Sequence, residues 1–135
     1  MGIDLYQNFL SYAKNKVPGA YFICADAHYI PLKEKLSDLT MSCEVLEHLQ
    51  NPYLSLKELK RISRNRIFLV VPLEKSLIFR IIWTLWCLIH KHNWGHIWKF
   101  DKKDIKMLLE KINLEIESIC TWYQILLAIV AKVKQ

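Results

Sequence analysis

The sequence predicts an α/β domain with a Rossmann-like, doubly wound sheet that is mostly parallel and has an antiparallel last strand. Three observations lead to this fold class. Short apolar runs alternate with segments of helical spacing over the first half of the chain. One of these runs is closed by Asp26, and another ends in Ser42-Cys43 before Glu44; parallel sheets place such strand ends at their ligand-binding edge. Two further β-rich runs, 114–119 and 125–133, follow each other without an intervening helix.

Hydrophobic periodicity and turn residues divide the first half of the chain into elements. Strands are expected where apolar β-formers run together, at residues 2–5, 20–25 and 39–43. Helices are expected where apolar residues recur every three or four positions, at residues 6–16, 44–49 and 52–64. Pro18-Gly19 ends the first helix. Asn51-Pro52 is typical of a helix start, because Asn caps the helix and Pro fits its first position.

The second half continues the same pattern. The continuous apolar run 66–71 is typical of a strand that is covered on both faces, and Pro72 stops it. Residues 76–90 are apolar almost all round a helix and are therefore predicted to be core. Asp101 caps the next helix, with Asp104 three residues later.

The composition fits a single globular domain over residues 1–135. Hydrophobic residues make up 53% of the chain, which excludes a disordered protein. The formal net charge is +6, and several basic residues fall on the helix expected at 52–64 and just after it. They predict a solvated helix face, with an acidic partner as the alternative. RNA binding is disfavoured, because no aromatic-basic RNA motif accompanies them.

The cysteines and the apolar stretches bear on the compartment. The chain contains Cys24, Cys43, Cys87 and Cys120, all in apolar surroundings and without a CxxC pair. They predict buried, reduced thiols in a cytoplasmic protein. No signal peptide is evident. The apolar stretches 77–89 and 125–133 are shorter than the roughly 20 residues that cross a bilayer, so no transmembrane segment is expected.

Four segments in this order resemble the class I S-adenosylmethionine-dependent methyltransferases, specifically the small-molecule group that includes quinone-biosynthesis O-methyltransferases. They are Gly2-Ile3-Asp4-Leu5, Ala25-Asp26-Ala27, Asp38 to Leu49, and His96 to Ile119. The resemblance implies S-adenosylmethionine as cofactor and methyl transfer to a small acceptor.

The resemblance also implies roles for individual residues. Asp4 would bind the ribose hydroxyls, and a carboxylate is able to accept hydrogen bonds from both hydroxyls of a diol. Leu5 would lie against the adenine ring, while Asp26 and the Ala27 backbone would meet the adenine amino group. The alternative for both acids is an ordinary turn or helix cap. Two further residues would line the channel near the sulfonium, Ser42 and Cys43.

The chain departs from the family at its beginning. The family opens with a strand and a Gly-rich loop that meets the methionine end of the cofactor, and the sequence has no replacement for them. The missing strand would sit at the centre of the sheet. Either the chain is N-terminally truncated, or another chain supplies the piece, or the sheet has closed up and catalysis is lost. The alternative to an enzyme is therefore an inactive subunit that completes or stabilises a partner, in a homo- or hetero-oligomer.

The segment Glu44-Val-Leu-Glu-His48 offers two kinds of chemistry. His48 is the candidate base for methyl transfer, against helix packing as the alternative. Glu44, Glu47 and His48 would share one helix face, where they are able to hold Mg²⁺ or another divalent ion. The same spacing resembles the metal site of quinone O-methyltransferases and small-RNA 2′-O-methyltransferases. It also occurs in relatives without a metal.

Residues 77–98 correspond to the region that covers the substrate pocket in the family. This segment contains Trp83, Trp86, Trp94 and Trp98. An aromatic, apolar cover favours a hydrophobic acceptor, with core packing or peripheral contact with a membrane surface as alternatives. The spacing of Cys87, His90, His92 and His96 matches no zinc finger, so a surface loop is expected there.

Overall fold

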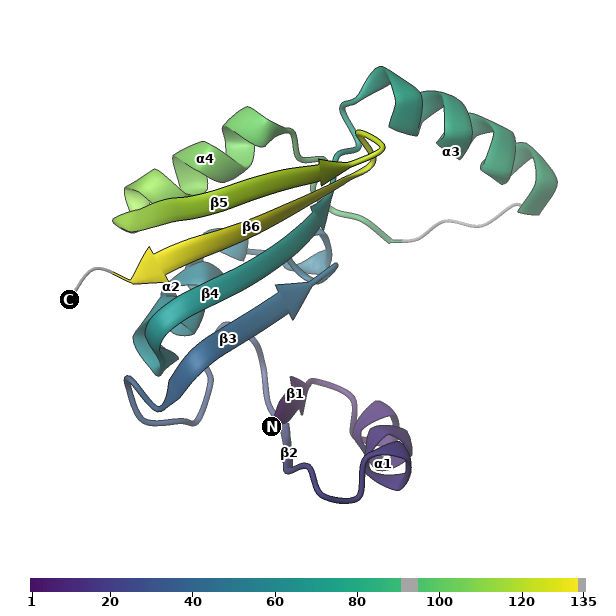
Figure 1. Ribbon diagram of the computed structural model, residues 1–135. Helices are drawn as coiled ribbons and strands as arrows, with labels where there is room; N and C mark the ends of the chain where they lie inside the picture. The colour runs from purple at the N-terminus through teal and green to yellow at the C-terminus, as the bar shows by residue number, and fades with distance from the viewer. Residues whose placement is uncertain (91–94, 134–135) are drawn as a thin grey trace.

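The computed structural model describes residues 1–90 and 95–133 (Figure 1), and with one exception it contains the strands and helices that the sequence predicts. The strands are β1 (Gly2–Asp4), β2 (Phe22–Cys24), β3 (Ser37–Cys43), β4 (Ser63–Pro72), β5 (Leu114–Trp122) and β6 (Leu126–Val133). The helices are α1 (Gln7–Lys16), α2 (Pro52–Ile62), α3 (Leu77–His90) and α4 (Lys102–Lys111), with a 3-10 turn, η1 (Leu46–His48). The helix expected over 44–49 is wrong in extent, because only η1 forms.

The strands form a four-stranded sheet in the order β3-β4-β6-β5 and a separate pair, β1-β2. β3 runs parallel to β4, and β1 runs parallel to β2. The last strand, β6, lies between β4 and β5 and is antiparallel to both (Figure 1). The predicted fold class, a mostly parallel α/β sheet with an antiparallel last strand, is confirmed.

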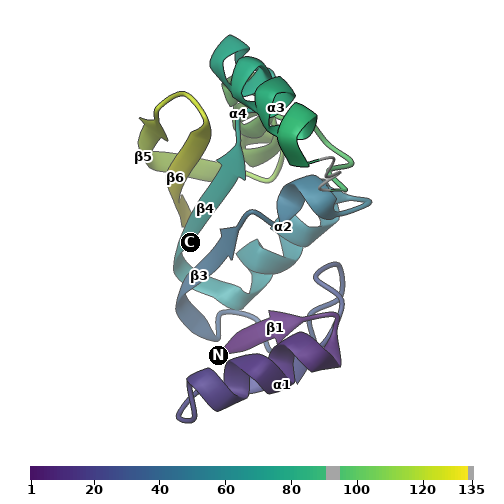
Figure 2. The same ribbon diagram turned by 90° about the vertical axis from the view of Figure 1, so that its right-hand side faces the viewer.

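The core lies between the four-stranded sheet and the helices on one of its faces. Figure 2 shows α2 and α4 on the same side of this sheet. Their buried side chains meet those of the strands, and the fully or nearly fully buried apolar residues include Leu56, Leu59, Ile67, Leu69, Val71, Ile105, Leu109, Leu127, Ile129 and Ala131. In the strands these residues alternate, so every second side chain points away from the helices.

The opposite face of the four-stranded sheet carries no helix among the described residues (Figures 1 and 2). Phe68 and Val70 on β4 are only half-buried there. Leu39 and Met41 on β3 are 51% and 59% exposed. The expectation that the 66–71 strand is covered on both faces is therefore wrong for the described chain.

The helix α3 also differs from the sequence expectation. It projects from the body of the sheet (Figure 1), and among its described side chains Leu77, Ile81 and Leu85 are more than half exposed. An apolar helix was expected to be core, but none of its described side chains is buried, and only Phe79 and Trp83 are half-buried, because no described element covers its outer side.

The expectation that the cysteines are buried is wrong for the three whose side chains are described. Cys24, Cys43 and Cys120 are exposed free thiols, and the side chain of Cys87 lies outside the described residues.

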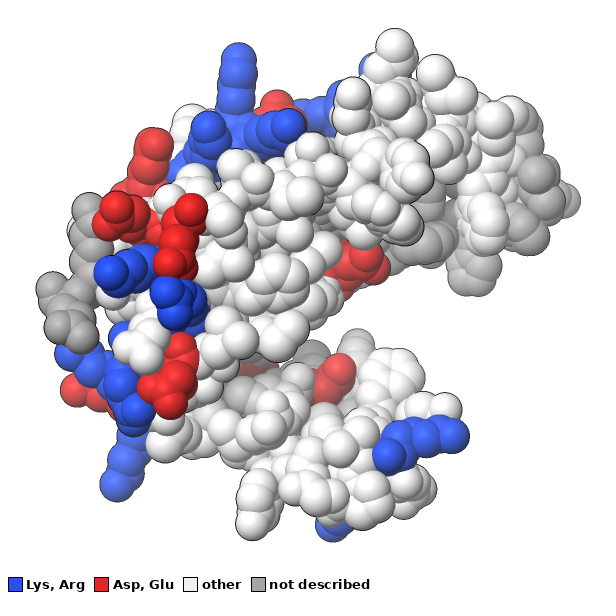
Figure 3. All heavy atoms as spheres, viewed as in Figure 1, with Lys and Arg blue, Asp and Glu red and all other residues white. Residues whose placement is uncertain are grey.

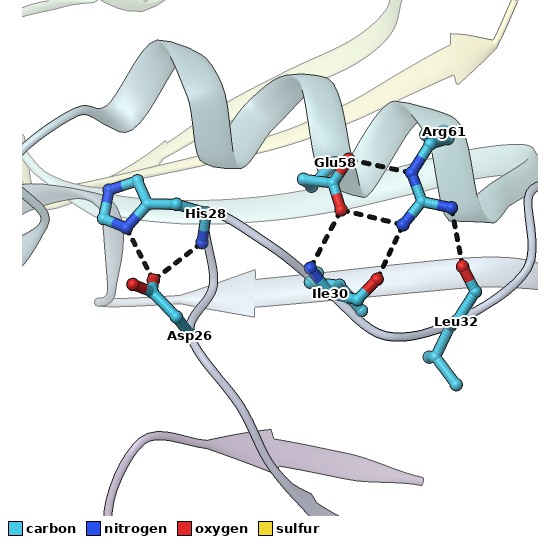
Figure 4. Close-up of polar contacts among 6 residues, drawn as sticks. All are labelled: Asp26, His28, Ile30, Leu32, Glu58 and Arg61. Carbon is cyan, nitrogen blue, oxygen red and sulfur yellow. Dashed lines mark hydrogen bonds and ion pairs between the residues drawn. The ribbon is translucent and has the colours of Figure 1, made fainter.

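The unit formed by β1, α1 and β2 is tied to α2 through the loop 25–36 (Figure 4). Arg61 donates from Nη2 to the Ile30 carbonyl (2.7 Å) and from Nη1 to that of Leu32 (2.6 Å). Glu58 pairs with Arg61 at 2.7 Å and accepts from the Ile30 amide at 2.9 Å. Figures 1 and 2 place β1 beside β3 with a break between them. The sheet has not closed up, and the break falls where the sequence predicted a missing central strand.

The two helix starts predicted from capping residues are confirmed. The side chain of Asn51 accepts from the Leu54 amide, and Pro52 is the first residue of α2. Asp101 and Asp104 form a reciprocal capping box at the start of α4. These caps fix where α2 and α4 begin, and both starts lie next to the strand ends described below.

Candidate functional site

Polar side chains follow the carboxyl ends of the parallel strands. Asp4 ends β1, Asp26 follows β2, Cys43 ends β3, and Glu74 follows β4. Because carboxyl ends of parallel strands share an edge, these residues gather along one side of the molecule, on both sides of the break. This edge is where α/β folds bind ligands.

Asp4 lies at the turn between β1 and α1. Its Oδ1 accepts from the Tyr6 amide at 2.8 Å, which is the local turn contact considered as the alternative to cofactor binding. A carboxylate is able to accept several hydrogen bonds, so Asp4 is still able to accept further ones from a ligand. Leu5 is 58% exposed beside it, and its carbonyl accepts from the Cys24 thiol at 3.3 Å.

Asp26 is engaged with His28. Its Oδ1 accepts from the His28 amide (2.8 Å) and from Nδ1 of the ring (2.6 Å) (Figure 4). The His28 backbone hydrogen bond is the largest effect on the Asp26 carboxyl and lowers its pKa. The His28 Nε2 accepts from the Asn51 amide at 3.2 Å, so the proton sits on Nδ1. This chain of contacts joins the β2 end to the start of α2. Ala27 is half-buried between them.

Ser42 and Cys43 end β3 in different environments. Ser42 is 7% exposed on the covered face, and Cys43 is exposed on the bare face. Partial burial raises the pKa of the Cys43 thiol. Glu44 follows with a positive φ of 53°, and its amide donates to the Val70 carbonyl at 2.9 Å.

Glu47, His48 and His96 form a cluster in which one ligand atom of each lies within 4.8 Å of the others. Glu47 is 0% exposed, and neither of its carboxyl oxygens has a hydrogen-bond partner among the described residues. Burial raises the pKa of Glu47 to about 7. The rings of His48 and His96 meet edge-to-face with centroids 4.6 Å apart. His96 Nδ1 also contacts the carboxylate of buried Glu74.

The chain after α3 holds this cluster together. The Ile97 and Trp98 amides both donate to the Glu47 carbonyl, at 2.8 and 3.0 Å. Trp98 Nε1 donates to the Leu49 carbonyl at 2.8 Å. Trp83 of α3 stacks on the His96 ring with centroids 6.4 Å apart. The inner stripe of α3 therefore lies over the histidine cluster, as a cover of the site would.

The sequence grouping of Glu44, Glu47 and His48 on one helix face needs correction. Glu44 precedes η1 in a left-handed conformation and is exposed, so it does not share a helical face with the other two. The structure brings His96 to the cluster instead, although the sequence assigned it to a surface loop. His92 and Trp94 lie outside the described residues.

Sequence reasoning missed Glu74 and His28. Glu74 stands two residues after the end of β4, in the same relation to its strand as Asp26 to β2, and this position was a usable signal. His28 had no signal, because its role depends on the distant Asn51.

A surface pocket of about 480 Å³ opens beside the start of α2 and the 98–100 segment. Its lining includes Tyr53, Trp98, Phe100 and Met107. The acid in it, Asp104, pairs with Lys75 at 2.7 Å and caps α4. This pocket therefore offers an aromatic surface, and its acid, Asp104, is already engaged in an ion pair and in the cap of α4.

Comparisons with known proteins identify the fold and the family. Residues 1–71 match the profile of the family described as Methyltransferase domain. No curated protein matches the chain. The match covers more than half of the chain and includes Asp4, Asp26 and the β3 end, so this chain belongs to the Methyltransferase domain family.

Solved structures show the same fold at low identity. A SAM-dependent methyltransferase from Thermotoga maritima is 15% identical, with a TM-score of 0.79 over 99% of this chain and 73% of that one. The methyltransferase solved in complex with the Haloferax volcanii Trm112 methyltransferase activator is 12% identical, with a TM-score of 0.80 over 99% of this chain and 71% of that one. Magnesium protoporphyrin IX methyltransferase from Synechocystis PCC 6803, solved with bound SAH, is 16% identical, with a TM-score of 0.74 over 98% of this chain and 63% of that one.

These matches define a class I S-adenosylmethionine-dependent methyltransferase fold. The family implies use of S-adenosylmethionine. None of the helices in residues 1–90 and 95–133 combines the length and apolarity that a membrane-spanning segment requires.

Proposed function

We propose that this chain takes part in S-adenosylmethionine-dependent methyl transfer to a small, hydrophobic acceptor. The observation that carries the proposal is the pair of acids, Asp4 and Asp26, that follows two adjacent parallel strands inside the segment matched by the family. Asp4 would bind the ribose, with Leu5 against the adenine and Asp26 with Ala27 at its amino group. Ser42 and Cys43 would line the channel to the reacting centre.

The cofactor, when bound, supplies an electrophilic methyl group on a sulfonium. Asp4, Asp26 and the exposed Leu5 would provide the nucleoside half of its site, because carboxylates accept hydrogen bonds from hydroxyl and amino groups and an exposed leucine is able to pack against a ring. Exposed His48 is the candidate base, because a methyl acceptor that must lose a proton during the reaction needs a group nearby that takes up this proton. The apolar α3, with Trp83 directed at His96, supports a hydrophobic acceptor, since it would cover that acceptor near the histidines. Peripheral membrane contact of α3 is the alternative use of its exposed side.

Calorimetry with S-adenosylhomocysteine tests the cofactor assignment. The titration is performed on the chain and on a fusion that places a strand and a Gly-rich loop ahead of Gly2. We expect binding in the fusion that weakens at least tenfold in Asp4→Asn. Asp38→Asn is the matched control, because Asp38 lies at the opposite end of β3 and pairs with Arg64. Absence of binding in the fusion, or equal loss in both variants, contradicts the proposal.

A second candidate function is a non-catalytic subunit that completes or stabilises a partner. The break between β1 and β3 supports it, since strand edges left without a neighbour favour association. This function predicts self-association or a stable hetero-complex in light scattering. A folded monomer that binds S-adenosylhomocysteine on its own would contradict it.

In place of the role of His48 as a base, we propose that Glu47, His48 and His96 hold a divalent metal ion, because an imidazole that ligates a metal is not free to take up a proton. A buried carboxylate without a hydrogen-bond partner is costly, and a cation within the 4.8 Å cluster would compensate it. Glu74 would fix the His96 ring in the way that outer carboxylates orient metal-binding histidines. One carboxylate and two imidazoles suit a first-row transition ion such as Zn²⁺, Mn²⁺ or Fe²⁺ better than Mg²⁺, which prefers oxygen ligands.

Metal content tests this assignment. The protein is stripped with chelator and titrated with Co²⁺, Zn²⁺ and Mg²⁺, with the Co²⁺ absorption spectrum as a direct report of ligation. We expect binding of Co²⁺ and Zn²⁺ that is lost in Glu47→Gln. Glu44→Gln is the control for charge, because Glu44 lies three residues away and outside the cluster. Equal binding by both variants contradicts the assignment.

A further inference from the structure

The pocket beside the start of α2 is separate from the cofactor and metal sites proposed above. Its lining comes from residues 50–53, residues 98–100 and α4, with Lys75, and its volume is about 480 Å³. None of the described residues that we assign to the cofactor or to the metal lines it. Pockets of about 300–1,000 Å³ are of the size that holds one small molecule. The pocket is therefore a candidate ligand site of its own.

Aromatic side chains make much of the pocket lining apolar. The rings of Trp98 and Phe100 lie nearly parallel, with 5° between their planes and centroids 6.4 Å apart. Phe100 is 3% exposed and Trp98 is 43% exposed, so Trp98 presents its ring to a ligand. The Trp98 ring is held in place, because its Nε1 donates to the Leu49 carbonyl at 2.8 Å. A fixed, flat indole favours a planar ring as its partner.

The uncompensated charges of the pocket lining are positive. Lys75 and the acid of the pocket, Asp104, pair with each other at 2.7 Å. The other two lysines of the lining, Lys99 and Lys111, are exposed and form no ion pair with any described residue. Two ammonium groups beside an aromatic surface suit a ligand that combines a ring with a carboxylate, sulfonate or phosphate.

The charge around the pocket has the same sign. Figure 3 shows Lys and Arg side chains gathered over α4, at the upper edge of this view, and few of them over α3. Helix α4 carries four lysines against two acids, namely Lys102, Lys103, Lys106 and Lys111 against Asp104 and Glu110. Such a positive surface attracts anions from solution and repels cations.

We propose that this pocket binds a small, planar aromatic anion. The ring of the ligand packs against Trp98, and its acidic group pairs with Lys99 and Lys111. A cationic ligand finds no free partner among the described residues of the lining, because Lys75 already holds Asp104. A neutral ring gains the contact with Trp98 alone, and an anion without a ring gains the lysines alone.

Nitrogen–proton correlation spectra of the chain, titrated with four probes, test this site. The probes are naphthoate, the corresponding neutral alcohol, the corresponding ammonium and acetate. The Trp98 indole N–H is the reporter, and the Trp122 indole, which lies outside the pocket, is the internal reference. We expect naphthoate to shift the Trp98 signal and to bind at least about fivefold more tightly than each of the other probes.

Substitution of single lysines separates pairing at the pocket from the general charge of α4. Lys111→Gln and Lys99→Gln should each weaken naphthoate binding about threefold and leave binding of the neutral alcohol unchanged. Lys106→Gln is the matched control, because Lys106 is an exposed lysine of the same helix outside the pocket lining. It should leave naphthoate binding within the error of the wild-type value.

Three outcomes would overturn the inference. The first is the absence of a Trp98 shift up to the solubility limit of naphthoate. The second is equal binding of naphthoate and the neutral alcohol, which would show an apolar surface without selection for charge. The third is equal weakening by Lys106→Gln and Lys111→Gln, which would show attraction to α4 as a whole. These readouts require neither S-adenosylmethionine nor a metal, so they are independent of the proposed function.

Discussion

Replacing Glu47 with Gln should remove a large part of the pH dependence of stability between pH 4.5 and 7. The Glu47 carboxyl is 0% exposed, neither oxygen has a partner among the described residues, and burial raises its pKa to about 7 from 4.5. In the unfolded chain the same carboxyl ionises near its ordinary value. The difference corresponds to about 3 kcal/mol at 1.36 kcal/mol per pKa unit.

The sign follows from the raised pKa. Below pH 4.5 the carboxyl is protonated in both states, and its contribution to the free energy of unfolding is fully present. As the pH rises to about 7 the unfolded chain loses the proton first, so this contribution falls by about 3 kcal/mol and then stays constant. Acids with lowered pKa values, such as Glu58 and Asp104, act in the opposite direction but below their ordinary values of 4.5 and 3.8.

Urea denaturation in chelator, followed by tryptophan fluorescence from pH 4.5 to 8, measures the effect. Gln has nearly the same shape but does not ionise. At pH 8 Glu47→Gln should therefore be more stable than the wild type by about 3 kcal/mol, and at pH 4.5 nearly equal to it. Glu44→Gln, at an exposed residue of the same segment, should retain the wild-type slope. A Glu47→Gln variant with the wild-type slope from pH 4.5 to 7, or one that is no more stable than the wild type at pH 8, would refute the reasoning.

The remaining predictions use the same denaturation assay. Arg61→Met should cost about 1–2 kcal/mol because it releases the loop 25–36, whereas Arg64→Met, from an exposed pair, should change little. Asp101→Ala should cost about 1 kcal/mol through the lost cap of α4, and no loss would contradict the capping box. Leu69→Ala in the core should cost about 2–5 kcal/mol and Leu85→Ala on exposed α3 less than about 0.5, and similar costs would contradict the burial assigned to them.

The strand and helix pattern was predictable because it depends on local periodicity. The starts of α2 and α4 were fixed by Asn51-Pro52 and by the Asp101–Asp104 box, since each cap is satisfied by residues three positions away. The antiparallel β6 followed from two strands without a helix between them. The acids at the ends of β1 and β2 were visible for the same reason, because a strand end is a local feature.

The histidine cluster was only partly predictable. Glu47 and His48 stand together in the sequence, but His96 and Glu74 reach them through contacts that bridge many residues. The amides of Ile97 and Trp98 bring this loop onto the Glu47 carbonyl, and such pairing leaves no trace in the periodicity of either segment. Glu44 was misassigned because its left-handed φ breaks the helical spacing on which the prediction relied.

The sequence by itself determined which residues are apolar, in what period, and therefore the class of fold and the family resemblance. Only the tertiary structure decided which apolar faces are covered. The strand 63–72 and the helix 77–90 read as core from composition, yet Phe68 is half-buried and Leu85 is 57% exposed. The periodicity of a sequence shows which faces are apolar, but an apolar face is buried only when a second layer of structure packs on it. The described residues supply such a layer on one face of the four-stranded sheet alone.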